Sequence, residues 1–429
     1  MRLAIVYLLL AFVAAGRPAQ AAHDLESPLE AATPAEAFTD GSLLFAVRPR
    51  YTWVDQGQPD KTYWGSVRTT LGWKTLSYYG FRVTAEAINV SRFDEHNVLD
   101  YRDTPAYRPR GVPGALYAPY GPGYYPRVAD PETTDANRLL LEYNGFPETQ
   151  IRLGRQTVRI DNQRFIGDYD AAQLPQALDG VMADNQSLPY TRVSGGYFNR
   201  VRDSYAVERQ ARIGVLNARF EPDVRIKLAA YGYAQNQAQT GSVTGLSDNS
   251  NRIVGGRIWG AWPLAGRTEL VYSAEGAQQR AFADGDPRID APYRRVGAGV
   301  AGRAGFARVD WERLGSNGGL YAFQTPLGTT QLFTGRADVF ATTPIVGLRD
   351  LRGSLGANFY TANLRLDYHR FHSDSNDRDL GREWDLTFGW SITSSISVDL
   401  GYADYRAGDA ITGFPDTRKI WVSAQYLYR

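Results

Sequence analysis

The chain has 429 residues, of which 47 are basic and 46 acidic, and it contains no cysteine. A net charge this close to zero argues against a nucleic-acid partner. With four histidines and no cysteine, the sequence offers no Cys/His metal cluster and no cysteine nucleophile, so we expect no cofactor. The mean hydropathy is −0.38, and no apolar run after residue 22 is long enough for a membrane-spanning helix.

The N-terminal residues have the pattern of a secretory signal peptide. Arg2 precedes an apolar stretch from Leu3 to Ala15, and Ala19-Gln20-Ala21 forms an Ala-x-Ala cleavage site. We therefore expect a signal peptide at 1–21, a periplasmic tether at 22–41 and an outer-membrane domain at 42–429. The absence of cysteine suits an oxidising compartment.

The rest of the chain alternates with a period of two, which is typical of β-strands. Within 43–53, apolar side chains at odd positions alternate with even positions that carry Leu44 and Ala46 and then Arg48, Arg50 and Thr52. Segments 81–87, 364–369 and 383–390 also alternate with a period of two. Such alternation predicts an all-β, transmembrane antiparallel barrel of about eighteen strands, in which alternate residues face lipid and water. The expected strands are 43–54, 62–74, 80–91, 138–145, 150–157, 178–185, 190–201, 211–220, 224–234, 252–262, 267–277, 293–303, 305–313, 349–359, 361–371, 382–392, 395–405 and 418–428.

The connections between these strands fall into two kinds that alternate. Short links lie at 75–79, 146–149, 186–189, 221–223, 263–266, 304, 360 and 393–394. Long ones lie at 92–137, 158–177, 235–251, 278–292, 314–348 and 406–417. This parity predicts short periplasmic turns and long extracellular loops, whereas a soluble β-sandwich or propeller gives no reason for it.

A barrel of this size is too wide for its own side chains to fill, so we expect an aqueous pore lined by inward residues. The inward arginines at Arg48, Arg50, Arg68, Arg82, Arg138, Arg152 and Arg365 are candidates for binding a solute, because the guanidinium group forks toward carboxylates or sugar hydroxyls. The alternative is that these arginines pair with inward acids and stiffen the wall.

The long loop at 92–137 is rich in Tyr, Pro, Gly and Arg, most of all between 105 and 126. This composition excludes a regular helix or strand there. Two interpretations stay open: the loop folds inward and narrows the pore, or it remains on the surface.

The stretch from Leu153 to Gly167, followed by Gln176-Ala177-Leu178-Asp179-Gly180, resembles the alginate export family of outer-membrane porins. The segments 340–351 and 368–371 are similar to the C-terminal half of that family. The resemblance implies an eighteen-stranded monomeric barrel that passes an anionic polyuronate through an arginine-rich constriction. The residues that match its motif are Arg155, Gln156, Asp161, Arg164 and Asp179. At 169–171 this chain has Tyr-Asp-Ala where the family has Trp-Arg-Gln.

The expected function is therefore an outer-membrane porin for a polar, anionic, alginate-like saccharide. The alternatives are a general or small-solute porin, a plugged receptor barrel and, from another class, a lipid-modifying enzyme that uses His372; we expect no enzyme, because adjacent strand residues point to opposite faces and cannot form a triad. The expected partners are outer-membrane lipids, lipopolysaccharide, the barrel-assembly machinery and the solute.

The signal-peptide assignment predicts the mass of the mature protein. Cleavage after Ala21 removes Arg2 and Arg17 and leaves 45 basic and 46 acidic residues. Intact-mass spectrometry of protein isolated from the outer membrane is expected to show a chain that begins at Ala22, and a retained Met1 would contradict the assignment.

Overall fold

The computed structural model describes residues 30–57, 61–96, 128, 130–236, 246, 248–408 and 414–428. The predicted signal peptide and most of the 92–137 loop lie outside the described residues. All eighteen predicted strands are present, and with them the all-β barrel is confirmed. The strands are β1 Ser42–Asp55, β2 Thr62–Lys74, β3 Phe81–His96, β4 Thr133–Phe146, β5 Thr149–Gln156, β6 Ala177–Asn185, β7 Thr191–Arg202, β8 Glu208–Asp223, β9 Ile226–Asn236, β10 Asn251–Pro263, β11 Glu269–Ala281, β12 Asp290–Gly302, β13 Gly305–Leu314, β14 Leu348–Phe359, β15 Ala362–His372, β16 Asp379–Ser391, β17 Ile396–Ala407 and β18 Thr417–Tyr428.

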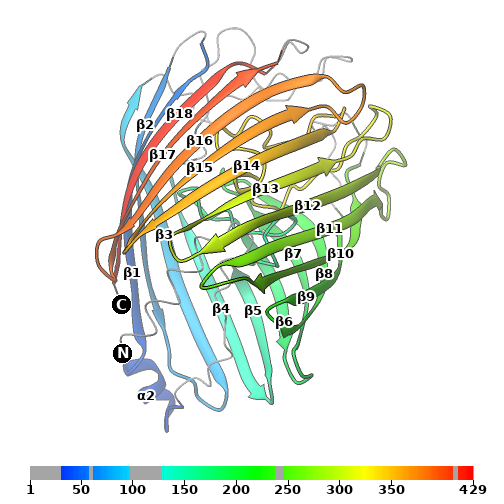
Figure 1. Cartoon of the computed structure of the whole chain (residues 1–429). Coiled ribbons are helices and arrows are strands. Elements are labelled where there is room, and N and C mark those ends of the chain that lie inside the picture. The colour runs from blue at the N-terminus through cyan, green and yellow to red at the C-terminus, as the bar shows by residue number, and fades with distance from the viewer. Residues whose placement is uncertain are drawn as a thin grey trace.

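The strands form one closed antiparallel sheet (Figure 1). Each strand pairs with its neighbours in the chain, and β1 pairs on its other side with β18, where Phe45 lies opposite Tyr428. Closure leaves no unpaired sheet edge. It also brings the first and last strands together, and the start of β1 and the end of β18 lie at the end of the barrel with the short turns.

Side chains alternate across the wall as the sequence predicts. In β16, Trp384, Leu386 and Trp390 point outward and are 41–47% exposed, while Glu383 and Asp385 point inward and are buried. The outer face is therefore apolar and the inner face polar. Among the described residues, no helix is long and apolar enough to span a membrane.

The two strands that flank the predicted loop at 92–137 are longer than predicted. β3 continues to His96 and β4 begins at Thr133, because the segments 92–96 and 133–137 contain neither glycine nor proline and extend the ladder. The connection between β3 and β4 is therefore shorter than the predicted loop at 92–137.

The predicted tether contains a short helix, α2 (Pro34–Thr39). Thr33 caps it by accepting a hydrogen bond from the Glu36 amide, and the Glu36 carboxylate accepts one from the Ala32 amide. The Trp73 indole at the end of β2 donates to the Phe38 carbonyl at 2.9 Å. The helix is thereby fixed at the end of the barrel with the short turns.

Candidate functional site

Two long connections fold into the barrel. We call residues 157–176, between β5 and β6, lumen loop 1, and residues 315–347, between β13 and β14, lumen loop 2. The loops are bonded to each other: the Gly167 amide donates to the Leu327 carbonyl at 2.8 Å, and the Thr329 amide to the Gln163 carbonyl at 2.9 Å. They bury an aromatic cluster against the wall, in which the Phe165 ring lies 5.1 Å from the ring of Tyr293. The long loops thus supply the interior packing that the strands alone cannot provide.

Lumen loop 1 is pinned to β13 by a buried arginine. Arg164 has no exposed surface, and its Nε lies 2.8 Å from Oε1 of Glu312. Its Nη1 donates to Thr325 of lumen loop 2 at 3.2 Å, and the Phe333 ring lies 4.8 Å from the guanidinium group. Arg164 is therefore an anchor inside the packed loops and does not line an open pore, contrary to the sequence-based expectation.

Sharp turns give lumen loop 1 its path. Asp161, Gln163 and Tyr169 all have φ between 49° and 64°, a conformation that non-glycine residues rarely adopt. At the first turn, Asp161 accepts a hydrogen bond from Asn217 of β8 at 2.6 Å and Asn162 donates to Glu275 of β11 at 2.9 Å. These contacts commit Asp161 to the wall.

The second half of lumen loop 1 crosses to β1 and β2. Arg48 donates to the backbone carbonyls of Asp170 and Ala172, and Arg50 donates to that of Ala171 at 2.5 Å. Arg68 donates to the Asp170 carboxylate at 3.0 Å. These three predicted pore arginines do face inward, but they hold the loop.

The segment that docks on β1 and β2 is 169–171, the place where the chain departs from the family motif that the sequence resembles.

Near its start, before both anchors in the chain, lumen loop 1 carries Arg159. Of the arginines in the two lumen loops, all of whose residues are described, only this one is exposed: 43% of its side chain is accessible. Its Nε lies 2.5 Å from the Asp168 carboxylate, and its Nη2 lies 3.7 Å from that of Asp170. The sequence did not predict Arg159 as a pore residue, because a loop has no alternation with a period of two that shows which side chains point into the barrel.

The pKa values of the two aspartates beside Arg159 are shifted in opposite directions. Burial raises the pKa of Asp168, although the Arg159 guanidinium opposes the shift. Desolvation also acts to raise the pKa of Asp170, but Arg68 and Arg48 outweigh it and hold that pKa below its ordinary value. Asp170 is therefore a charged carboxylate between Arg68 and Arg159.

Lumen loop 2 closes the other side of this region. The Tyr169 hydroxyl lies 3.3 Å from the Asp338 carboxylate, which also pairs with Lys419 of β18. The Ala337 amide donates to Glu383 of β16 at 2.7 Å. The constriction is thus framed by both loops and by the wall from β16 to β2.

The remaining inward arginines of the predicted set form ion pairs within the wall, three of them between neighbouring strands and that of Arg365 within β15. Their partners are Glu142 for Arg82, Glu86 for Arg138, Asp184 for Arg152 and Asp367 for Arg365, all at 2.6–3.0 Å. The pairing alternative considered from the sequence describes these residues. They stiffen the inner wall and leave the loops to define its narrowest part.

The predicted eyelet at Arg155 and Asp179 is wrong in position. Both residues stand opposite each other in the register of β5 and β6, on the side of the wall that carries exposed Leu153. Arg155 pairs there with Asp135, Asp179 and Glu208 at 2.5–3.1 Å. The reason is strand parity: Arg155 is an even number of residues from the outward Leu153.

Gln156, the last residue of β5, points inward and is 1% exposed, so it is packed against the start of lumen loop 1 and offers no surface to a solute. Among the described residues, no group of His, Asp or Glu side chains has the arrangement to hold a metal ion.

The fold is similar to those of known crystal structures. OccAB1 of Acinetobacter baumannii is 13% identical, with a TM-score of 0.68 over 91% of this chain and 97% of that chain. The outer membrane protein OpdK of Pseudomonas aeruginosa is also 13% identical, with a TM-score of 0.66 over 91% and 99%. A structure of OpdK with vanillate gives 12% and 0.62 over 91% and 99%. No protein-family model and no curated protein sequence matches the chain, so membership of the alginate export family stays a prediction.

The anchor at Arg164 can be tested directly. Arg164→Ala leaves the Glu312 carboxylate buried without its partner, which is expected to lower the free energy of unfolding by about 3–5 kcal/mol. We also expect faster hydrogen exchange in 157–176, measured by mass spectrometry. Arg200→Ala, which removes a 42%-exposed arginine from the outer face, is the control. Unchanged exchange in the Arg164 variant would show that other contacts hold the loop.

Proposed function

We propose that the chain is an outer-membrane channel for small polar solutes, with a preference for anions. The observation that carries the proposal is the course of lumen loop 1, which reaches β8 and β11 at Asp161 and Asn162 and β1 and β2 at 170–173. These strands lie on opposite sides of the ring. A loop that bridges the lumen and carries one exposed guanidinium group, that of Arg159, is suited to screen solutes by size and charge.

The outside of the barrel supports the location. Its apolar outer face would lie in lipid, with closed backbone pairing all round, as a membrane-spanning barrel requires. The predicted signal peptide would direct the chain out of the cytoplasm.

Small solutes fit the interior better than a long polyuronate. The two lumen loops occupy much of the space that a polysaccharide would need, and the Arg155 and Asp179 pair of the alginate-like motif faces away from it. OpdK, a structural neighbour, has been crystallised with vanillate, a small aromatic carboxylate. We therefore favour a small-solute porin over an alginate exporter.

The charges at the constriction favour anions modestly. The charged residues around Arg159 and around the end of lumen loop 1 that docks on β1 and β2 are Arg48, Arg50, Arg68, Arg159, Asp130, Asp168 and Asp170. Four arginines against three aspartates leave an excess of one positive charge. Arg159 is the arginine of this group that does not connect the loop to the barrel wall. Its contact with the Asp168 carboxylate orients its planar guanidinium group.

The proposal predicts a change of ion selectivity in Arg159→Gln. Loss of the exposed positive charge is expected to shift the reversal potential in a KCl gradient toward cation selectivity. It should also weaken block by small carboxylates such as vanillate by about tenfold, the value of one charge-assisted hydrogen bond. Planar-bilayer recording of the refolded protein measures both.

Arg200→Gln is the matched control, because Arg200 is as exposed as Arg159 but lies on the outer face. Equal changes in the two variants, or block by neutral sugars as strong as block by carboxylates, would contradict selection by Arg159.

A further inference from the structure

The outer face of the barrel carries rows of arginine at the end with the long connections. In the first row, Arg370 of β15 lies directly opposite Arg382 of β16, and Arg382 lies opposite Arg406 of β17. Arg370 and Arg382 are exposed, and all three share a face with outward residues such as Leu386. Like charges placed directly opposite one another in a sheet repel, so this row is unfavourable unless an anion lies against it.

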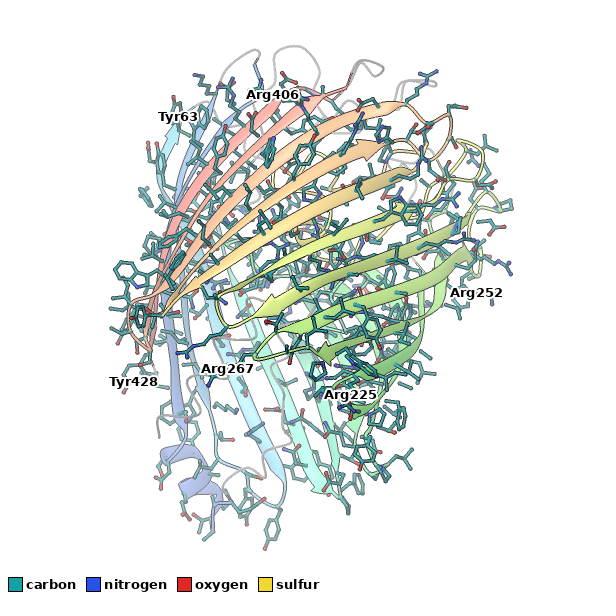
Figure 2. The ribbon with its side chains drawn as sticks, viewed as in Figure 1. Tyr63, Arg225, Arg252, Arg267, Arg406 and Tyr428 are labelled. Atoms are coloured by element: carbon teal, nitrogen blue, oxygen red, sulfur yellow. The ribbon has the colours of Figure 1, made fainter. Side chains whose placement is uncertain are left out.

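The same arrangement continues along the wall. Arg313 of β13 lies opposite Arg294 of β12 on one side and Arg349 of β14 on the other. Farther round, Arg252 of β10 lies opposite Arg280 of β11. We call these three rows the arginine belt. Figure 2 shows Arg252 and Arg406 toward one end of the barrel and Arg225 and Arg267 toward the other.

Half of the belt has no carboxylate of its own. Arg280, Arg313, Arg349 and Arg406 form ion pairs with aspartates of the adjoining strands and loops. No ion pair joins Arg252, Arg294, Arg370 or Arg382 to any residue that the structure describes. The belt therefore keeps an excess of positive charge.

The opposite half of the barrel differs. On the outer face of β5 to β8, Arg155 and Arg200 are matched by Asp179 and Glu208. Arg212 of β8 is also exposed on this face and has no ion pair to a described residue, so outward arginines without an acidic partner are concentrated on β10 to β17 but not confined to them.

The position of the arginine belt along the barrel axis indicates which part of the membrane it contacts. Tyr368 and Trp384 lie opposite each other two residues nearer the middle of the barrel than Arg370 and Arg382, with ring centroids 4.5 Å apart. Trp311 precedes Arg313 in the same way. Aromatic side chains mark the boundary between hydrocarbon and headgroups in membrane barrels. The arginines just beyond them lie at the level of lipid headgroups.

We propose that the arginine belt binds the phosphate groups of lipid A, the lipid anchor of lipopolysaccharide, in the outer leaflet. Guanidinium groups grip phosphate through two parallel hydrogen bonds, and adjacent arginines on neighbouring strands supply several such forks to one headgroup. The inference rests on the proposed outer-membrane location, but it is independent of the solute and of Arg159.

Native mass spectrometry of the refolded protein in detergent, titrated with purified bisphosphorylated lipid A, tests the proposal. Arg370→Gln/Arg382→Gln is expected to weaken lipid A binding at least tenfold, at about fivefold per arginine near a charged surface. The control is Arg267→Gln/Arg303→Gln, which removes two exposed arginines from the short turns at the opposite end. Because no transport is measured, failure of this proposal and failure of the channel proposal are distinguishable.

Binding of related ligands to the unmodified protein tests whether the phosphate groups of lipid A are recognised. Chemically dephosphorylated lipid A should bind unmodified protein at least tenfold more weakly, a comparison that decides the question even if the double variant does not fold. Inorganic phosphate at millimolar concentration should compete weakly. Equal binding of the dephosphorylated lipid, equal losses in both double variants, or equally tight binding of phosphatidylglycerol would overturn the proposal.

Discussion

The buried ion pair between Arg164 and Glu312 is the interaction on which the interior of this protein depends. An eighteen-stranded barrel is wider than its inward side chains can fill, so segments between strands must supply the packing. A guanidinium group with no exposed surface, 2.8 Å from a carboxylate on β13, fixes the first of these segments and joins it to the second. Because breaking a buried pair leaves an uncompensated charge, the loop is held in one position.

With lumen loop 1 fixed at β13, most of the inward arginines of the wall have a structural partner. The arginines of β1 and β2 bind carbonyls and a carboxylate of the loop, those of β3 to β5 pair across strands, and Arg365 pairs within β15. Arg159, near the start of the loop, keeps its side chain half accessible. Selectivity in such an interior is set less by the number of inward arginines than by the few that the structure does not use for its own stability.

On the outer face, by contrast, several arginines have no acidic partner among the described residues. On β5 to β8, Arg155 and Arg200 have acidic partners, whereas Arg370 and Arg382 face each other without one. A surface that tolerates like charges side by side is adapted to an anionic environment, because the repulsion disappears when phosphate lies between them.

The sequence by itself determined the wall: alternation with a period of two is a local property, and it located all eighteen strands and the parity of their connections. It also decided the faces of Arg48, Arg82 and Arg365, whose strands alternate clearly. Only the tertiary structure decided the site, because lumen loop 1 has no periodicity and its path follows from contacts with residues such as Glu312, 148 positions away in the chain. Arg155 lies between these cases. Its parity with Leu153 was visible in the sequence, but its three acidic partners come together only when β4 to β8 are assembled side by side.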